Sequence, residues 1–258
     1  MPAKTETKQA LGASVLIRRA KPGTDFFVRK GQPAMPKDKV NWEQWRSWVS
    51  RGAEALGIEL DCHKIGQLEV FAKELLEAAG SVNLTSVEDP LEVAENLMLD
   101  SMVPGKFIPS GAGVLDLGTG AGIPGIPLKI ACPELGMTLI DSRRKRISFV
   151  KYAITCLGLE NIRAVNARAQ DFAGDNEKFD VVVSRAVSSV KELVRLASPL
   201  LKPGGMLIAM KGREYDKELE EAGLDNAGQG GGPKVRIEKY RLPVLAIDRV
   251  LVMIDFYS

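Results

Sequence analysis

The chain has 258 residues, of which 45% are hydrophobic, and its formal net charge is +2. This length and apolar content are typical of one globular domain with additional segments. No apolar run reaches the roughly 20 residues of a membrane-spanning helix, so we expect no membrane segment. The three isolated cysteines and the single histidine, His63, argue against disulfides and exclude a multi-histidine metal site; we expect no metal and a cytoplasmic location.

Positive charge is concentrated in residues 1–40, which carry nine Lys and Arg against three acidic side chains. We interpret this segment as a basic, disordered arm, because it has little hydrophobic periodicity. The remaining chain carries 26 basic and 30 acidic side chains, a net charge of −4. Any nucleic-acid surface on the folded body must therefore be local.

Residues 41–110 have a helical pattern, and we predict an N-terminal helical region packed on the core. Trp42, Trp45 and Val49 fit one helix face. The tryptophans could stack on bases, but packing within a helical core is favoured by the pattern.

From residue 111 to residue 258, strand and helix patterns alternate. The predicted strands are 113–118, 136–141, 162–166, 179–184, 205–211, 234–241 and 249–256. The predicted helices are 124–131, 143–157 and 188–200. Such alternation predicts an α/β fold with a mostly parallel, seven-stranded sheet, helices on both faces and an antiparallel final pair.

The most informative segment is a glycine-rich turn between the first of these strands and its helix. Asp116 ends an apolar run, and Gly118, Gly120 and Gly122 follow at alternate positions. A strand, a tight turn and a helix start form a site for a nucleotide-like ligand. The GxGxG spacing resembles the first motif of S-adenosylmethionine-dependent methyltransferases, so the resemblance implies this cofactor.

Asp141 ends the second strand, about 20 residues after the turn, where a carboxylate can accept both hydroxyls of an adenosine ribose. A helix N-cap is the alternative, and NAD would suit the same two features. The Pro203-Gly-Gly turn resembles one in many class I methyltransferases. Ala169 and Gln170 follow the third strand, where an adenine edge would lie, although a helix cap explains them equally well.

A basic cluster follows Asp141, formed by Arg143, Arg144, Lys145 and Arg146. Positions 143–147 span a full helical turn, so the charges cannot all share one face. A solvated helix face is the usual explanation for such a run. Beside the cofactor edge of an acidic body, contact with RNA phosphates becomes a competing interpretation.

Arg185 closes the fourth strand within Ser184-Arg-Ala, and that strand end faces the transferred methyl in methyltransferases of this fold. The chain has neither the Pro-Pro motif of amino-methylating enzymes nor a Pro-Cys nucleophile. Arg185 could bind a carboxylate, a phosphate or guanine, or be an ordinary surface arginine. Guanine N7 has a lone pair and no proton to lose, so its methylation needs orientation more than a general base.

Together these residues resemble the bacterial small-subunit ribosomal RNA guanine-N7 methyltransferases of the GidB/RsmG type. The motifs that carry the resemblance are Asn83-Leu-Thr-Ser-Val, Leu99-Asp-Ser, Asp116-Leu-Gly-Thr-Gly-Ala-Gly-Ile-Pro-Gly-Ile-Pro-Leu, Asp141-Ser with Lys145-Arg146 and Phe149, Ser184-Arg-Ala, and Leu200-Leu-Lys-Pro-Gly-Gly with Lys211-Gly212. The resemblance implies a cofactor pocket using Gly118, Ile123, Asp141, Ala169-Gln170 and Arg185. From the glycine-rich turn we also expect Asp116, Gly120 and Gly122 to bind the cofactor.

The chain departs from the family in its helical region. Asn96-Leu97 stands where members usually carry Arg-His, and Ala79-Gly-Ser-Val82 stands where they tend to have Trp and Tyr. Contacts with RNA are therefore less secure than contacts with the cofactor.

The resemblance implies a class I methyltransferase that modifies N7 of one guanine in small-subunit (16S) ribosomal RNA, alone or in an assembling 30S subunit. We expect a monomer in which Arg185 has the catalytic role. The alternatives are a class I methyltransferase acting on another RNA or a small molecule, and a ribosome-associated binding protein without catalysis.

Overall fold

The computed structural model describes residues 16–17, 27–28, 40–82, 87, 89–172, 177–185, 188–224 and 233–256, except for the side chains of 16–17, 27–28 and 79–82. The chain forms two compact units, Met1–Ala34 and Met35–Ser258. In the first unit, β1 (Leu16–Ile17) pairs antiparallel with β2 (Phe27–Val28). The predicted disorder of the basic arm otherwise falls outside the described residues.

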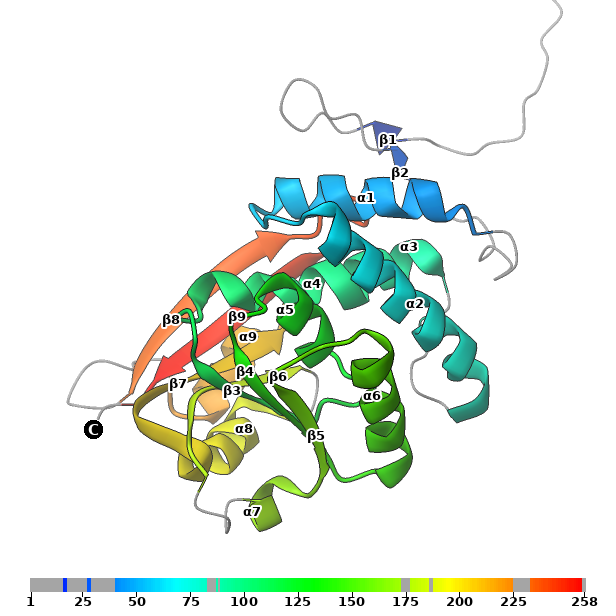
Figure 1. The fold of residues 1–258 in the computed structure, drawn as a ribbon. Helices are drawn as coiled ribbons and strands as arrows, with labels where there is room; N and C mark the ends of the chain where they lie inside the picture. The colour runs from blue at the N-terminus through cyan, green and yellow to red at the C-terminus, as the bar shows by residue number, and fades with distance from the viewer. Residues whose placement is uncertain are drawn as a thin grey trace, which may run out of the picture. The chain divides into compact units, whose positions relative to one another are not determined.

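The described part of the second unit is built around a seven-stranded sheet (Figure 1). Its strands are β3 (Gly113–Leu117), β4 (Gly136–Asp141), β5 (Ile162–Asn166), β6 (Phe179–Arg185), β7 (Leu201–Lys211), β8 (Lys234–Arg241) and β9 (Asp248–Asp255). They lie in the order β5-β4-β3-β6-β7-β9-β8. The first five pair in parallel, and β9 is antiparallel to both β7 and β8. The predicted mostly parallel sheet with an antiparallel final pair is confirmed.

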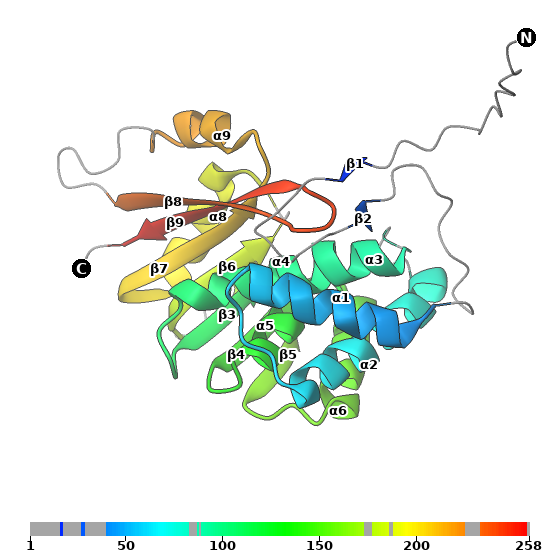
Figure 2. The same ribbon diagram turned by 90° about the horizontal axis from the view of Figure 1, so that it is seen from above.

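Helices cover both faces of this sheet (Figure 2). They are α1 (Trp42–Ala55), α2 (Cys62–Val82), α3 (Pro90–Glu92), α4 (Asp100–Met102), α5 (Gly125–Ala131), α6 (Arg144–Cys156), α7 (Ala169–Phe172), α8 (Val190–Ala197) and α9 (Tyr215–Glu221). A π-helical stretch, Val93–Leu99, joins α3 to α4, and 3-10 turns lie at Val103–Phe107 and Ser198–Leu200. α1 to α6 lie on one side of the sheet, and α8 and α9 lie on the other.

Two apolar cores result from the alternation of side chains along the central strands. Val114 and Val181 face the core shared with α1, α2, α5 and α6, whereas Leu115 and Val182 face the core shared with α8 and α9. Successive strand residues point to opposite faces, and a parallel strand covered on both faces must be apolar throughout. This requirement explains why these strands read as continuous Val, Leu and Ile runs.

The N-terminal helices belong to the first of these cores. The Trp45 side chain is fully buried in the cluster, and its indole Nε1 donates to the Pro90 carbonyl oxygen at 2.9 Å. Trp42 and Trp48 are partly buried against the same cluster. For Trp45, packing within the helical core is therefore confirmed and base stacking is excluded.

The main boundary difference lies at β7, which begins at Leu201 and not at 205. Leu201 pairs with Phe179, the register shifts, and pairing resumes between Met206 and Val181. A Cβ on Gly205 would lie 2.9 Å from the Lys202 carbonyl oxygen, so only glycine fits. The Pro-Gly-Gly segment is therefore a bulge within the strand and not a turn before it.

Candidate active site

The glycine-rich turn connects β3 to α5, as its sequence predicts. Gly118, Gly120 and Gly122 have φ values of +77°, +58° and +91°. Residues other than glycine rarely adopt this left-handed backbone conformation. The three glycines therefore allow the backbone to turn sharply at the carboxyl end of β3. A large cleft, lined by this turn and by Asp141, opens there.

Asp116 lies beneath this turn and not in the cleft. Its carboxylate is fully buried; Oδ2 accepts hydrogen bonds from Thr119 Oγ1 at 2.5 Å and from the Gly125 amide at 2.9 Å. Asp116 therefore fixes the turn to the start of α5, and its place in the predicted cofactor site is indirect. Burial raises the pKa of this carboxyl to about 7, although the hydrogen bonds from Thr119 and Gly125 oppose the shift.

This raised pKa predicts a pH-dependent stability. An acid whose pKa is 3.8 unfolded and about 7 folded binds more protons in the folded state between these values. The free energy of unfolding therefore falls as pH rises through that window, by a contribution on the order of 4 kcal/mol. Asp116→Asn keeps an acceptor for Thr119 and Gly125 but does not ionise. We expect denaturant unfolding of this variant to lack the decline between about pH 5 and pH 7.

Asp180→Asn is the matched control for this experiment. The Lys202 ammonium lowers the pKa of the Asp180 carboxyl. Asp180 therefore changes the free energy of unfolding only at pH values below the window in which Asp116 acts. That variant should retain the wild-type decline between about pH 5 and pH 7. An Asp116→Asn protein that also retained it would contradict our assignment.

Gly122 also faces away from the cleft. A Cβ there would lie 2.6 Å from Ile126 Cδ1 and 3.6 Å from Phe71 Cζ. Gly122 therefore does not line the cleft. Its lack of a side chain lets the turn pack on α2 and α5.

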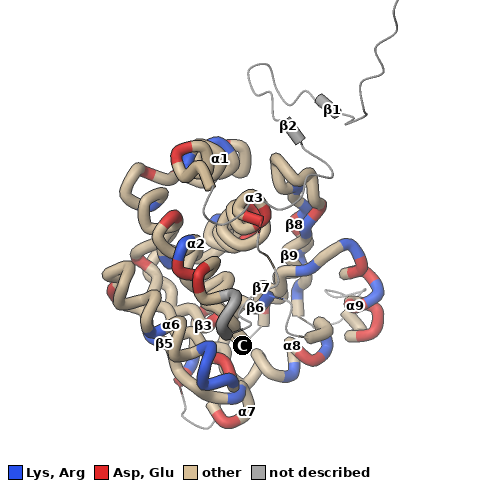
Figure 3. The backbone as a smooth tube through the Cα atoms, turned by 90° about the vertical axis from the view of Figure 1, so that its right-hand side faces the viewer, with Lys and Arg blue, Asp and Glu red and all other residues tan. Residues whose placement is uncertain are grey.

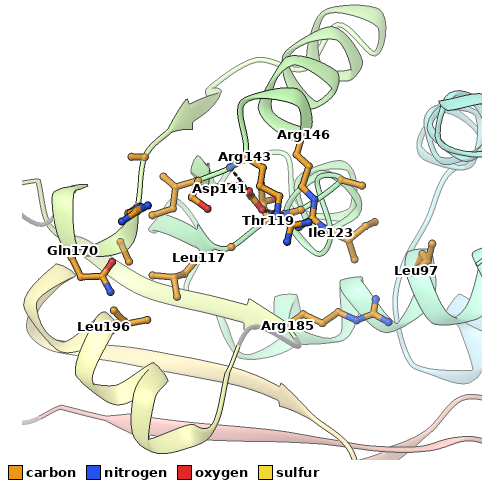
Figure 4. Close-up of a pocket in the computed structure, with 18 of the residues that line it drawn as sticks. Leu97, Leu117, Thr119, Ile123, Asp141, Arg143, Arg146, Gln170, Arg185 and Leu196 are labelled. Carbon is orange, nitrogen blue, oxygen red and sulfur yellow. Dashed lines mark hydrogen bonds and ion pairs between the residues drawn. The ribbon is translucent and has the colours of Figure 1, made fainter. Parts of the chain in front are cut away.

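The cleft itself opens beside the carboxyl ends of β3, β4 and β6 and has a volume of about 1060 Å³ (Figure 4). Seven predicted cofactor residues line it: Gly118, Gly120, Ile123, Asp141, Ala169, Gln170 and Arg185. In Figure 4, Gln170 and Leu196 lie at one end, whereas Arg185 and Leu97 lie at the other. Sequence reasoning missed Leu97, Leu196 and Thr119 as lining residues. Leu97 and Thr119 lie in segments quoted above but had no role assigned to them, and no motif includes Leu196.

Asp141 lies in the middle of the cleft, at the end of β4. Its Oδ2 accepts the Gly120 amide at 3.0 Å, and its Oδ1 accepts the Arg143 amide at 2.7 Å. Arg146 Nη1 lies 3.4 Å from Oδ2. The carboxylate thus ties the glycine turn to the start of α6, yet carboxylate oxygens keep further lone pairs for ligand hydroxyls. The predicted role as ribose acceptor is compatible with this geometry. The alternative, a helix N-cap, is wrong, because the N-cap residue of α6 is Arg143 and no side chain caps that helix.

The predicted basic cluster divides between two surfaces. Arg143 and Arg146 line the cleft, whereas Arg144 is exposed outside it and Lys145 lines a separate depression beside Tyr152. The helical rotation of about 100° per residue separates them, as the sequence analysis anticipated.

Gln170 reaches the cleft from α7, a four-residue helix that the sequence did not predict. Phe172 on the same helix is buried against Phe179, which fixes α7 to the sheet. The apolar walls nearby are formed by Leu117, Ile140 and Leu196. This end of the cleft can therefore enclose a flat ring and offer an amide to its polar edge.

Arg185 is held at the opposite end by a buried carboxylate. Its Nη2 lies 3.5 Å from Asp100 Oδ2, and its side chain is 18% exposed. Among the described residues, none is a hydrogen-bond partner of the buried Nη1. Burial lowers the pKa of this guanidinium, which Asp100 opposes. A buried donor without a partner costs free energy, so Nη1 is suited to an acceptor on a ligand.

Two of the quoted motifs are described only in part. Asn83 to Ser86 and Ala186 lie outside the described residues. Among the side chains that the structure describes, no group of three or more His, Cys, Asp and Glu is placed to bind a metal ion. Within the same residues, no helix is both long and apolar enough to cross a membrane.

Comparisons with known proteins show to which family this chain is similar. A family model described as GidB, rRNA small subunit methyltransferase G, matches residues 64–234. The chain is 39% identical over 209 residues to ribosomal RNA small subunit methyltransferase G of Lachnoclostridium phytofermentans, covering 79% of this chain and 86% of that protein. It is 37% identical over 207 residues to the protein of the same name from Geobacter sp., covering 80% and 95% respectively.

The fold likewise has a solved counterpart. The O-methyltransferase TomG from Streptomyces achromogenes, solved in complex with SAM, superposes with a TM-score of 0.53 at 15% identity, covering 84% of this chain and 99% of that chain. At this identity the likeness supports the class I methyltransferase fold alone. On the family model and the curated relatives, the chain belongs to the rRNA small subunit methyltransferase G family.

Proposed function

We propose that this enzyme transfers a methyl group from S-adenosylmethionine to N7 of a specific guanine in small-subunit (16S) ribosomal RNA. Family membership supports the reaction class. The observation that carries the proposal is the cleft, in which Gln170 lies at one end, Asp141 in the middle and Arg185 at the other end. Within the part of the chain that the structure describes, the buried Arg185 Nη1 has no hydrogen-bond partner.

The part of the cleft between Gln170 and Asp141 suits S-adenosylmethionine. Asp141 would accept the ribose hydroxyls, and Ala169 and Gln170 would meet the adenine edge. The backbone of Gly118 and Gly120 approaches the cleft without a Cβ, which leaves room for the methionine part beside Ile123. When bound, the cofactor supplies a methyl group on a positively charged sulfur.

The acceptor end supports attack by a group that has no proton to lose. Asp141 is the one acidic side chain among the described residues that line the cleft, and its oxygens already accept the Gly120 and Arg143 amides. Guanine N7 needs no base, because its lone pair is already available. Arg185 would donate from Nη1 to guanine O6, an acceptor beside N7, which orients the base while keeping N7 free.

The rim of the cleft suits RNA phosphates. Arg143 and Arg146 line it, and Arg144 and Lys145 extend the positive charge outward on α6. We propose that this cluster contacts the RNA backbone, because arginine and lysine supply most phosphate contacts in protein–nucleic acid complexes.

We expect Arg185→Ala to lower kcat/KM for RNA by about 100-fold, the effect of losing one charge-assisted hydrogen bond of roughly 3 kcal/mol. Cofactor affinity should change much less, because Arg185 lies at the far end of the cleft from Gln170 (Figure 4). Steady-state methyl transfer to 30S subunits and calorimetric cofactor titration measure the two quantities. Arg195→Ala, at an exposed pair with Glu192, is the matched control. Wild-type turnover in Arg185→Ala would remove Arg185 from the site.

The function is tested directly by mapping the modified nucleotide. Small-subunit RNA from a deletion strain should lack one N7-methylguanosine, and the purified enzyme should restore it with S-adenosylmethionine. Unchanged N7-methylguanosine content in the deletion strain would contradict the proposal. Methyl transfer to another RNA or to a metabolite alone would identify a different class I methyltransferase.

We further propose that the enzyme acts as a monomer in the cytoplasm, on free small-subunit RNA or an assembling 30S subunit. In the described part of the chain, the exposed large hydrophobic side chains are Val70, Tyr152 and Ile237, which lie on three different elements. Scattered apolar side chains of this kind do not form an oligomer interface. Light scattering of the purified protein would reveal a dimer.

A further inference from the structure

A second concave surface lies at the other half of the sheet, between α9 and the β8–β9 pair. Its volume is about 460 Å³. We name it the basic groove and define it by its charged lining residues, Arg213, Lys239, Arg241, Arg249, Asp216 and Asp248. Lys and Arg segments occur along β8, β9 and the approach to α9 in Figure 3.

The basic groove differs in charge from the rest of the folded body. Four cations and two carboxylates leave it a net charge of +2, whereas residues 41–258 together carry a net charge of −4. A concentration of positive charge on an acidic body is a local electrostatic footprint for a polyanion.

Internal ion pairs leave much of this charge available. Asp248 is shared, with Oδ2 at 2.9 Å from Arg213 Nη2 and Oδ1 at 3.5 Å from Arg241 Nη1. The side chains of Arg213 and Arg241 are 75% and 50% exposed. Exposed pairs of this kind contribute about 0–1 kcal/mol, and each guanidinium has five donors, so a phosphate can bind without a large loss.

The basic groove also lies at the same edge of the sheet as the acceptor end of the cleft. Because β9 runs antiparallel to β7, Val250 near the start of β9 pairs with Lys211 at the end of β7. Arg185, at the end of β6, pairs with the neighbouring residue, Met210. The carboxyl edge of the sheet therefore carries both surfaces.

A buried carboxylate joins the two surfaces directly. Arg249 Nε of the groove and Arg185 Nη2 of the cleft each lie 3.5 Å from Asp100 Oδ2. The Tyr240 hydroxyl donates to Asp100 Oδ1 at 2.5 Å. A nucleic-acid strand that inserts one base beside Arg185 therefore has its flanking backbone within reach of the groove.

From this arrangement we propose that the basic groove binds the phosphate backbone of the RNA strand next to the target guanine. The inference rests on the proposed RNA methyltransferase function. Arginines match phosphate geometry with paired N–H donors, and contacts of this class position the strand without reading its sequence. Arg213, Lys239 and Arg241 thus extend RNA binding beyond the rim formed by α6.

The test is a salt titration of RNA affinity with the full-length protein. Deproteinised 16S ribosomal RNA is bound in the presence of S-adenosylhomocysteine, and log K is plotted against log salt concentration. We expect Arg213→Ala/Arg241→Ala to weaken binding about tenfold near physiological salt and to reduce the slope by about 1.5, the effect of two lost phosphate contacts. In methyl transfer, the loss should fall on KM for RNA and not on cofactor affinity.

A second variant should act in the opposite direction. Asp248→Asn removes the shared carboxylate while preserving the arginines, so we expect tighter RNA binding and a steeper salt slope. Lys202→Ala/Arg163→Ala is the matched control: both side chains are about half exposed and ion-paired, with Asp180 and Glu177 respectively, and each lies near the amino end of its strand. The control should bind RNA as the wild type does.

Wild-type affinity and slope in both groove variants would overturn the proposal. The proposal would also be overturned if Arg213→Ala/Arg241→Ala bound naked RNA normally but 30S subunits weakly, because the groove would then face a ribosomal protein. Failure of the wild-type enzyme to methylate both deproteinised 16S ribosomal RNA and 30S subunits would instead refute the proposed function. The binding titration would still decide whether the groove binds RNA.

Discussion

Asp141→Ala is expected to weaken S-adenosylmethionine binding by about 100-fold, which corresponds to roughly 2.7 kcal/mol. Two effects combine in this loss. The variant removes the proposed acceptor of the ribose hydroxyls, and it releases the Gly120 and Arg143 amides that Asp141 holds at 3.0 and 2.7 Å. The glycine turn then loses its tie to α6, so its backbone is no longer prearranged for the cofactor. Calorimetric titration with S-adenosylmethionine measures the loss.

Asp180→Ala is the control for this comparison. Asp180 also accepts a backbone amide, from Gly113 at 2.8 Å, but it lies at the amino end of β6. Its removal should leave cofactor affinity unchanged. If Asp141→Ala bound the cofactor as tightly as Asp180→Ala does, the ribose would not be held at Asp141.

The parts of the fold that the sequence predicts are those encoded by short-range patterns. Strands β3 and β4 match because their buried runs end in turn residues. Strand β5 also matches, although it is an edge strand in which Ala164 alone is buried. The glycine turn is predictable because left-handed backbone leaves few residue choices. By contrast, α7 has only four residues, too few for a helical period to be recognised.

The role of Asp116 shows where a motif misleads. Its position in the motif predicts a cofactor contact, yet the side chain turns under the loop to bind Thr119 and Gly125. Spacing along the chain does not reveal on which side of a turn a carboxylate lies. The support that Asp116 gives to the turn therefore required the three-dimensional structure.

The acceptor end of the cleft was the least predictable part. In the π-helical stretch the repeat differs from 3.6 residues, so helical periodicity does not indicate which side chains face inward. Leu97 lines the cleft, while Asn96 accepts a hydrogen bond from Arg249, 153 positions away. Glu95 is buried and accepts the amides of Val244 and Leu245. Such pairings depend on tertiary packing and leave no local pattern.

Asp100 is the carboxylate on which this packing depends, and Asp100→Ala should cause the largest loss of stability. Its side chain is 2% exposed and lies within 3.5 Å of both Arg185 and Arg249. Burial and the nearby Asp100 charge raise the pKa of Tyr240, so its hydroxyl remains a donor to Asp100. Removing one member of a buried ion cluster leaves the other charges uncompensated, which costs about 3–5 kcal/mol.

We therefore expect Asp100→Ala to lower Tm by roughly 10 °C, because a domain of this size loses about 2–4 °C per kcal/mol. Asp100→Asn should lose less, since its amide oxygen still accepts the Tyr240 hydroxyl while the negative charge is absent. Glu192→Ala is the control, because Glu192 pairs with Arg195 on the surface with 39% of its side chain exposed; it should cost about 0–1 kcal/mol. Thermal and denaturant unfolding measure all three variants. Equal losses in Asp100→Ala and Glu192→Ala would mean that the buried cluster does not hold Arg185 at the cleft, and the orienting role proposed for that guanidinium would lose its structural basis.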